Sequence, residues 1–374
     1  MINFLIIGDL KGKRVSFFIK TLKILGIKNY NILSWIDLIE DINTLNKYLK
    51  NNTIIKIEPP EKDLDIYKAF LKKGIKANVI SDKQIDKLNF DDYKLISPKQ
   101  WFFGVNNVFE NIKNLVKASS YNIFMMNDID EAITMMDKKL SYKKLNDNLE
   151  GKSFNLPKLY DVKDNFYSFE EMYSNKSINA FIKLRYGSGS IGVLAYKNNP
   201  KKNKQILYTS LRYKNNNFYS EKKVRKYEDK NEIKVLLDWV LKNDAHMESW
   251  IPKSKYDDKS FDTRVLMINK KPNYLISRFS NSPITNLHLD NKRLESKEFL
   301  DDSQIKILKD SSKDVCKVFE KSMFMGLDIV TSNSFKPYII DVNPFGDLFY
   351  NLNDGKNIIY EKEIKLAIKK LRGE

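Results

Sequence analysis

Residues 338–347 read YIIDVNPFGD, an apolar run that ends in polar side chains. Asp341 and Asn343 stand two residues apart, directly after Ile339 and Ile340. Because successive side chains of a strand point to opposite faces, Asp341 and Asn343 are expected to share a face with Ile339. An unpaired carboxylate buried in such a strand would be strongly destabilising. The stretch therefore predicts a strand whose carboxylate has a cation beside it.

The segment upstream predicts the partner strand. MGLDIVTS places Asp328 in another apolar run, and SNSFKP reads as a turn before YIIDVN. If the two runs pair as a hairpin, Asp328, Asp341 and Asn343 come together. Carboxylate and amide oxygens suit Mg²⁺, with Mn²⁺ as an alternative. The competing interpretation is a structural network in which the acids pair with Lys or Arg.

A glycine-rich loop suggests a second half of the site. The loop is GSGSIG and contains Gly187, Ser188, Gly189, Ser190 and Gly192. VLAYK follows it and reads as a strand, so the loop is expected at a hairpin tip, not before the helix that a dinucleotide site needs. Such a loop can fold over phosphates as a lid, although a flexible turn would read the same way. Lys183, in the apolar run AFIKLRYG, needs a partner, and a nucleotide phosphate would be one.

The pattern of apolar runs predicts an α/β fold in two parts. Residues 1–95 alternate three strands with three helices, which indicates a parallel sheet with covering helices. The first turn, GDLKGK, lacks a dinucleotide fingerprint. Residues 96–150 read as mainly helical, and short strands with glycine turns follow. A helix at 302–325 is expected before the hairpin, and a boundary between the parts is expected near residue 125.

Composition excludes several classes of protein. With 374 residues, 42% of them hydrophobic, the chain is long enough for two or three folded domains. A single cysteine, Cys316, excludes a disulfide framework and a Cys-based zinc site. No apolar run approaches the roughly 20 residues of a membrane-spanning helix, so a cytoplasmic protein without a membrane partner is expected.

The net charge of +17 has two readings. The basic residues comprise 57 Lys and only 8 Arg. A nucleic-acid-binding chain more often uses Arg, whose planar fork reads phosphates and guanines. The lysine excess, together with many Asn and Ile, favours coding bias and solubility over a pull towards an acidic partner, and nucleic acid is not the favoured ligand.

Taken in order along the chain, these features resemble the ATP-grasp superfamily, and within it the RimK-like carboxylate–amine ligases and a less-characterised bacterial branch. The resemblance rests on Lys183 with GSGSIG, Glu248 in ESWIPK, FDTRVLMI, TNLHL and the set of Asp328, Asp341 and Asn343. It spans roughly residues 130–365. It implies a Rossmann-like domain over 1–125 and a two-subdomain ATP-grasp domain over 126–374, with a β-rich lid subdomain at about 150–250.

The resemblance also implies roles for single residues. Lys138 in MDKKLSYKKL looks like the first phosphate-contacting lysine, with Lys139 as a competing assignment, and Lys183 looks like the second. The segment that should clamp adenine contains Glu248, Trp250 and Ile251. The residues expected near the transferred phosphate or the substrate carboxylate are Arg264, Arg278 and Asn286.

Two positions of the resemblance stay open. The family more often has Glu where this chain has Asp341, and the shorter side chain makes the bridging of two metal ions less certain. For the contact with the ribose of the nucleotide, Asp257 and Asp258 are both candidates, and their spacing does not choose between them.

The implied activity is an ADP-forming ligation with ATP and Mg²⁺. Phosphorylation of a substrate carboxylate gives an acylphosphate, which an amine then attacks to form an amide. The alternatives are an ATP-grasp kinase that phosphorylates a hydroxyl and a regulator that binds ATP without turnover. Residues 197–230 carry eleven Lys or Arg against three Asp or Glu, interleaved with aromatic residues. This segment and Arg264 and Arg278 would suit an acidic peptide or amino acid, although a solvated lysine-rich surface is equally expected, and the oligomeric state is open.

Overall fold

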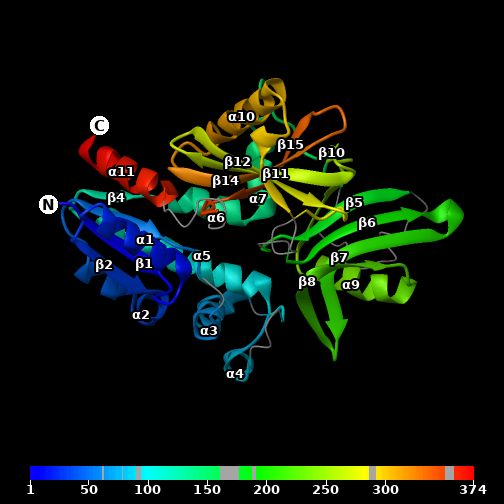
Figure 1. Cartoon of the computed structure of the whole chain (residues 1–374). Coiled ribbons are helices and arrows are strands. Elements are labelled where there is room, and N and C mark those ends of the chain that lie inside the picture. Colours follow the sequence, from blue (N-terminus) through cyan, green and yellow to red (C-terminus); the bar gives the residue numbers. More distant parts are fainter. Residues whose placement is uncertain are drawn as a thin grey trace.

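The computed structural model describes residues 1–60, 63–77, 79–89, 94–160, 177–187, 191–285, 292–349 and 358–374. Ser188, Gly189, Ser190 and Asn286 lie outside the described residues. Within them the chain forms a parallel sheet near the N-terminus, an antiparallel sheet in the middle and a second antiparallel sheet near the C-terminus (Figure 1). Helices accompany each sheet, so the predicted α/β class is confirmed.

The N-terminal sheet has the strand order β2-β1-β3-β4, and each of its pairs is parallel. Its strands are β1 (Asn3–Gly8), β2 (Tyr30–Ser34), β3 (Thr53–Ile57) and β4 (Ile123–Met125). The accompanying helices are α1 (Lys13–Ile24), α2 (Trp35–Glu40), α3 (Leu64–Lys73), α4 (Asp82–Asp86) and α5 (Pro98–Ala118), with short 3₁₀ helices at Ile42–Lys47 and Ile75–Ala77. The strand β4 falls in the segment predicted as helical, because three residues are too few to show an alternating pattern.

The middle sheet is antiparallel in the order β8-β7-β6-β5-β9. The helices α6 (Ile129–Met136) and α7 (Lys138–Asn146) lead into it. Its elements are β5 (Ile178–Leu184), β6 (Val193–Asn199), a 3₁₀ helix at Pro200–Lys202, β7 (Lys204–Lys214), β8 (Asn217–Tyr227), α9 (Lys230–Lys242) and β9 (Ala245–Ser249). The apolar face of α9 packs on this sheet through Ile233, Leu237 and Val240.

The C-terminal sheet is also antiparallel, in the order β13-β12-β11-β14-β15, with β10 paired to β11. Its elements are β10 (Lys255–Tyr256), β11 (Lys259–Ile268), β12 (Lys271–Ser280), β13 (Arg293–Glu295), a 3₁₀ helix at Ser296–Glu298, α10 (Asp302–Cys316), β14 (Phe324–Thr331) and β15 (Pro337–Asn343). The helix predicted to reach residue 325 ends at Cys316. The chain beyond it buries Val318 and Phe319 in the core of this sheet instead.

The last helix, α11 (Ile358–Arg372), packs beside α1, β3 and β4 (Figure 1). Ile359, Tyr360 and Ile364 share a buried cluster with Phe4 and Phe18. The two ends of the chain therefore build one hydrophobic core, which joins the N-terminal sheet to the C-terminal sheet. The domain boundary near residue 125 stays a prediction.

A buried network of charged side chains crosses the contact between α11 and the N-terminal sheet. The ammonium of Lys56 on β3 lies 3.2 Å from a carboxylate oxygen of Glu363 on α11 and 3.7 Å from one of Glu58. Glu58 also accepts hydrogen bonds from Arg14 (2.8 Å) and from the Tyr360 hydroxyl (2.5 Å). Burial raises the pKa of Glu363, and Glu58 beside it acts in the same direction, while Lys56 opposes both. The two cations offset the two carboxylates, which makes the charges tolerable in a core.

The middle sheet contacts the N-terminal part directly. The ring of Tyr186, just after β5, stacks on Phe102 of α5 with 4.3 Å between ring centroids. The backbone N–H of Leu95 donates to the carbonyl of Phe218 on β8 at 2.8 Å. An ion pair of 2.7 Å joins Lys99 to Asp244. The base of the predicted glycine-rich lid is therefore anchored on α5.

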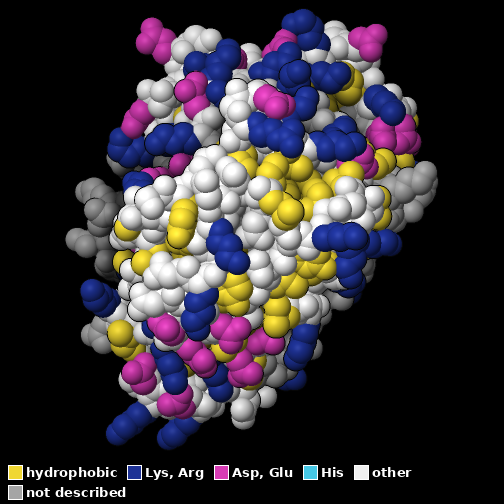
Figure 2. Space-filling model, turned by 90° about the vertical axis from the view of Figure 1, so that its left-hand side faces the viewer, with side chains coloured by type: hydrophobic (Ala, Val, Ile, Leu, Met, Phe, Trp, Pro, Cys, Tyr) yellow, Lys and Arg dark blue, Asp and Glu magenta, His cyan; other side chains and the backbone are white. Residues whose placement is uncertain are grey.

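Figure 2 shows the face on which the N-terminal sheet lies. Lys and Arg side chains gather in its upper part, but Asp and Glu side chains stand among them and below them. The excess of positive charge is thus interrupted on this face, and the face does not present the continuous basic surface that a nucleic-acid backbone would need. None of the helices in the described ranges has the length and apolar content that crossing a membrane requires.

The buried network predicts a large stability difference between two lysine substitutions. Lys56→Met leaves the carboxylates of Glu58 and Glu363 short of a cation in the core, so we expect it to lower the free energy of unfolding by about 3–5 kcal/mol. Lys365→Met removes a surface pair with Glu361 on α11 and should cost less than about 1 kcal/mol. Urea unfolding followed by circular dichroism measures both, and equal losses would contradict the role given to Lys56.

Candidate functional site

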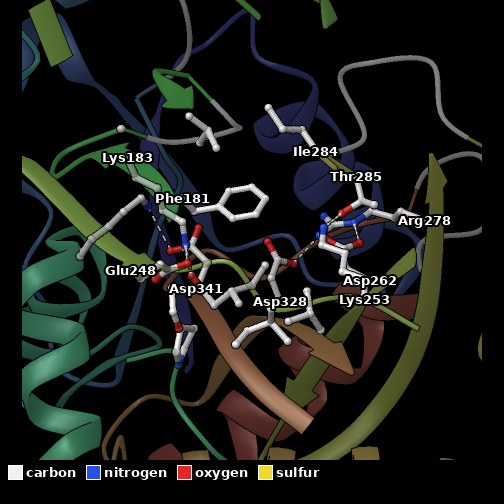
Figure 3. A pocket seen from close by; sticks show the side chains of 18 of the residues that line it. Phe181, Lys183, Glu248, Lys253, Asp262, Arg278, Ile284, Thr285, Asp328 and Asp341 are labelled. Atoms are coloured by element: carbon white, nitrogen blue, oxygen red, sulfur yellow. Dashed lines mark hydrogen bonds and ion pairs between the residues drawn. The ribbon is translucent and has the colours of Figure 1, made fainter. Parts of the chain in front are cut away.

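A cleft lies between the middle sheet and the C-terminal sheet (Figure 3). It encloses about 710 Å³ of space, a volume that includes the solvent-filled opening of the cleft. The residues that line it are Lys138, Pro157, Phe181, Lys183, Gly187, Ile191, Val193, Glu248, Ser249, Ile251, Lys253, Asp262, Arg278, Ile284, Thr285, Asp328, Val330, Ile340 and Asp341. Apolar side chains from the middle sheet thus face charged side chains, many of which come from the C-terminal sheet.

The predicted hairpin forms, with a bulge that corrects one expectation. Asp328 on β14 pairs with Asp341 on β15, but the next residue, Ile329, pairs with Ile339, so Ile340 is the extra residue. Ile339 lies in the core, whereas Ile340 and Asp341 line the cleft. Asp341 therefore faces away from Ile339 and not with it. A bulge shifts the alternation of the strand by one residue, and sequence spacing alone does not reveal one.

One end of the cleft holds Lys183 and Glu248 (Figure 3). The two side chains are on the adjacent strands β5 and β9, and they form a buried ion pair. The Lys183 ammonium also donates to the backbone carbonyl of Ile340 at 3.1 Å. Burial raises the pKa of Glu248, but Lys183 and His246 lower it by more, so the net shift is downward. Lys183 thus has protein partners, although an ammonium has a third N–H to offer a ligand.

Lys138 forms an ion pair with Asp341 in the same cleft. Its ammonium lies 3.1 Å from a carboxylate oxygen of Asp341. The helix α7 begins at Lys138, because Asp137 accepts hydrogen bonds from the N–H groups of Lys139 and Leu140 as its N-cap. Arg185 fixes Asp137 in turn, through two hydrogen bonds of 2.8 and 2.7 Å. The clamp joins the start of α7 to the end of β5. Lys138 therefore points into the cleft, while the competing candidate Lys139 does not line it.

The other end of the cleft is a buried chain of arginines and aspartates. Arg278 makes two hydrogen bonds to Asp262, of 2.6 and 2.5 Å, and its Nη2 lies 2.9 Å from Asp328. Arg264 contacts the same Asp328 carboxylate at 2.7 Å. Burial raises the pKa of Asp328, but Arg264 and Arg278 outweigh that effect and hold it below its usual value. Asp328 is therefore an ionised carboxylate between two guanidinium groups.

Asn343 completes the trio predicted to hold a metal ion. It pairs with Gly326 across the hairpin, and among the described residues its buried side-chain Nδ2 has no hydrogen-bond partner. The loop after it is held from the N-terminal side, because Asn127 donates to the carbonyl of Pro344 at 2.8 Å and Arg14 donates to that of Phe345. In the described ranges no group of three His, Cys, Asp or Glu gathers at one point. A metal ion would have to use the amide beside the two carboxylates.

The remaining predicted residues fall around this frame. Gly187 lines the cleft, and Gly192 has a positive φ of +65° that favours glycine. Ile251 also lines the cleft, but Trp250 does not: its ring lies edge-on to Phe181, at 5.2 Å between centroids, with the ammonium of Lys197 over its face.

Sequence reasoning missed several cleft residues, among them three polar ones. Lys253 and Thr285 line the cleft, and the Lys253 ammonium donates to the Thr285 hydroxyl at 2.7 Å. Asp262 also lines the cleft and is the main partner of Arg278. One weak indication of Lys253 existed, because this lysine stands shortly after the segment that is expected to clamp adenine. Nothing in the sequence said which of the many nearby lysines points inward.

Comparisons with known proteins agree with this geometry. A family model described as YheC/D like ATP-grasp matches residues 132–369. No curated protein matches the chain.

Three solved structures illustrate the likeness in fold. D-alanine–D-alanine ligase from Bacillus anthracis has a TM-score of 0.54 at 14% identity, with 100% of this chain and 98% of the ligase covered. The ATP-grasp ligase PsnB, complexed with a minimal precursor, Mg and ADP, has a TM-score of 0.52 at 9% identity, covering 98% and 97%. D-cycloserine synthetase DcsG has a TM-score of 0.52 at 8% identity, covering 98% and 99%. The predicted ATP-grasp fold is therefore confirmed, while the RimK-like branch stays a prediction.

The arginine–aspartate chain predicts a pH-dependent loss of stability. Arg278→Met removes a cation from two buried carboxylates and should lower the free energy of unfolding by about 3–5 kcal/mol at pH 7. Because the pKa of Asp328 lies below its usual 3.8 in the folded protein, the ion pair contributes fully above that pH and is lost as the pH falls through the lowered value. Urea unfolding at pH 7 and at pH 3 should therefore give a smaller difference between wild type and variant at pH 3. A constant difference would contradict the assignment.

Proposed function

Because this chain belongs to the YheC/D-like ATP-grasp family, we propose that it is an ADP-forming ligase that joins a carboxylate to an amine through an acylphosphate. Its cofactors are ATP and Mg²⁺. The observation that carries the proposal is the cleft itself. Lys138 and Lys183 lie towards one end and Arg278 at the other, with the paired carboxylates of Asp328 and Asp341 between them (Figure 3).

The lysines and the apolar wall support nucleotide binding. Lys183 keeps one N–H beyond its contacts with Glu248 and Ile340, and Lys138 has a single carboxylate partner, so both can donate to phosphate oxygens. Phe181 and Ile251 provide an apolar surface on which an adenine ring can lie. Gly187 and Ile191 line the same cleft, and we expect the glycine-rich loop to which they belong to exclude water from a reactive intermediate.

The oxygen ligands of the hairpin fit a magnesium ion. Asp328 and Asp341 pair directly across the two strands, and Asn343 follows on β15, where its amide oxygen can serve as a neutral ligand. These three residues would hold Mg²⁺, which would neutralise charge on the phosphates during transfer. Arg264 and Arg278 contact Asp328, and Lys138 contacts Asp341, so both carboxylates are oriented before an ion binds.

The arginines are suited to the chemical step. A free carboxylate is a poor electrophile because its leaving group would be oxide, and transfer of the γ-phosphate to it supplies a good leaving group. Charge then spreads over the phosphate oxygens, and a rigid guanidinium stabilises it without rearrangement. Arg278 is fixed by Asp262, and within the described part of the chain its buried Nη1 has no hydrogen-bond partner, which leaves a donor for the substrate or the transferred group.

The substrate class is the finer part of the proposal. PsnB is recorded with a precursor peptide, and the other two relatives are named for D-alanine and D-cycloserine. We assign this chain an amino acid or an acidic peptide as carboxylate donor. The basic segment 197–230 supports a peptide only in part, because Arg212 and Arg225 both already contact Glu221.

Loss of a phosphate-contacting lysine should abolish the reaction. We expect wild-type protein with ATP, Mg²⁺ and a mixture of amino acids and glutamate-containing dipeptides to release ADP and to accumulate a condensed amide. Lys183→Ala should reduce both by at least a hundredfold, because the variant loses a charge beside the transferred phosphates. Mass spectrometry of products and an ADP assay measure the effect.

Lys309→Ala, an exposed position on α10 away from the cleft, is the matched control and should behave as wild type. A product with the mass of a phosphate ester would show that the protein is a kinase and not a ligase. ATP binding without ADP release from any mixture would favour a regulator.

A further inference from the structure

The third lysine of the cleft is used by none of the steps above. Lys253 follows β9, and Figure 3 places it beside Asp262, Arg278 and Thr285, across the cleft from Lys183. Its ammonium donates to the Thr285 hydroxyl at 2.7 Å. Lys138 and Lys183 each contact a carboxylate, whereas in the described part of the chain no carboxylate lies within ion-pair distance of Lys253. Lys253 thus faces the cleft with a neutral partner only.

The surroundings of Lys253 lower the pKa of its side chain. Burial lowers the pKa of the Lys253 ammonium to about 8. The neighbouring cations Arg278 on β12 and Lys183 on β5 act in the same direction, while Asp262 on β11 and Asp328 on β14 oppose them. A lysine shifted in this way exchanges its proton near neutral pH, which is the property that a general base needs.

The other titratable groups of the described cleft are poor proton acceptors. Its four carboxylates are each in contact with a cation: Glu248 with Lys183, Asp262 with Arg278, Asp328 with Arg264 and Arg278, and Asp341 with Lys138. The pKa of Glu248 and that of Asp328 are both lowered by these contacts. His246 contacts Glu248 and does not line the cleft. Among the described residues, Lys253 is the group best placed to accept a proton.

Resting on the ligase function proposed above, we infer that Lys253 is the general base for the amine co-substrate. The amine arrives as an ammonium, and the neutral Lys253 amine takes one proton from it. The nitrogen lone pair then attacks the acyl carbon, the bond from that carbon to the phosphate oxygen breaks, and the second proton of the nitrogen leaves with the phosphate. The Lys253 ammonium afterwards returns its proton to solvent. The step needs no reactant beyond the amine and the acylphosphate.

Hydroxylamine separates this step from the rest of the reaction. It is largely unprotonated at neutral pH and traps an acylphosphate as a hydroxamate without a base. ATP, Mg²⁺ and a mixture of amino acids and glutamate-containing dipeptides serve as substrates, with and without hydroxylamine. The variants are Lys253→Arg, which keeps the positive charge but cannot give up its proton, and Lys253→Met, which keeps neither. Lys255→Arg on the exposed strand β10 is the matched control.

We expect Lys253→Arg to form amide at least tenfold more slowly while its hydroxamate yield stays within twofold of wild type. The wild-type rate of amide formation should rise with pH through a pKa at or above about 8, because bound phosphates favour the ammonium form, and the Lys253→Arg rate should lack that rise.

Two results would overturn the inference while leaving the ligase intact. In the first, Lys253→Arg makes amide as fast as wild type. In the second, both Lys253 variants lose hydroxamate and amide equally, which would make Lys253 an anion contact. A wild-type protein that yields neither ADP nor hydroxamate would instead refute the ligase function, and the role of Lys253 with it.

Discussion

The site depends on the pairing of Asp328 with Asp341 across the β14–β15 hairpin. Two carboxylates so close would repel each other, and each is buried at least in part. Cations from three different elements contact the two carboxylates and offset this repulsion: Lys138 from α7, Arg264 from β11 and Arg278 from β12. The bulge at Ile340 is the second requirement, because without it Asp341 would point into the core with Ile339.

The rest of the structure holds this hairpin in place from several sides. The N-terminal unit supports the loop after β15 through Asn127 and Arg14, and α11 returns to close its core. The start of α7 is joined to the end of β5 by Asp137 and Arg185, which fixes Lys138 relative to Lys183. Precise placement of charged groups is what electrostatic catalysis requires, since a preorganised site does not need to rearrange as charge develops.

The middle sheet is tied to the N-terminal unit as well as to the cleft. Tyr186 leaves β5 immediately before the glycine-rich loop and stacks on Phe102 of α5. The segment around Leu95 adds a backbone hydrogen bond to β8. These contacts hold the middle sheet in a fixed position relative to α5.

The sequence alone was sufficient for the local pieces and their chemistry. These pieces depend on residues close together in the chain: the strand and helix periods, the hairpin with Asp328 and Asp341, the glycine-rich turn and the inward lysine Lys183. The resemblance to ATP-grasp proteins then assigns each piece its place in the fold. Tertiary structure decided the remainder. The partner of Lys183 is Glu248 on a neighbouring strand, Asp341 changes face through a bulge, and Lys253 lies half-buried near Asp262 and Arg278. Partners and pKa values of this kind depend on groups far apart in sequence, and only packing brings those groups within reach of one another.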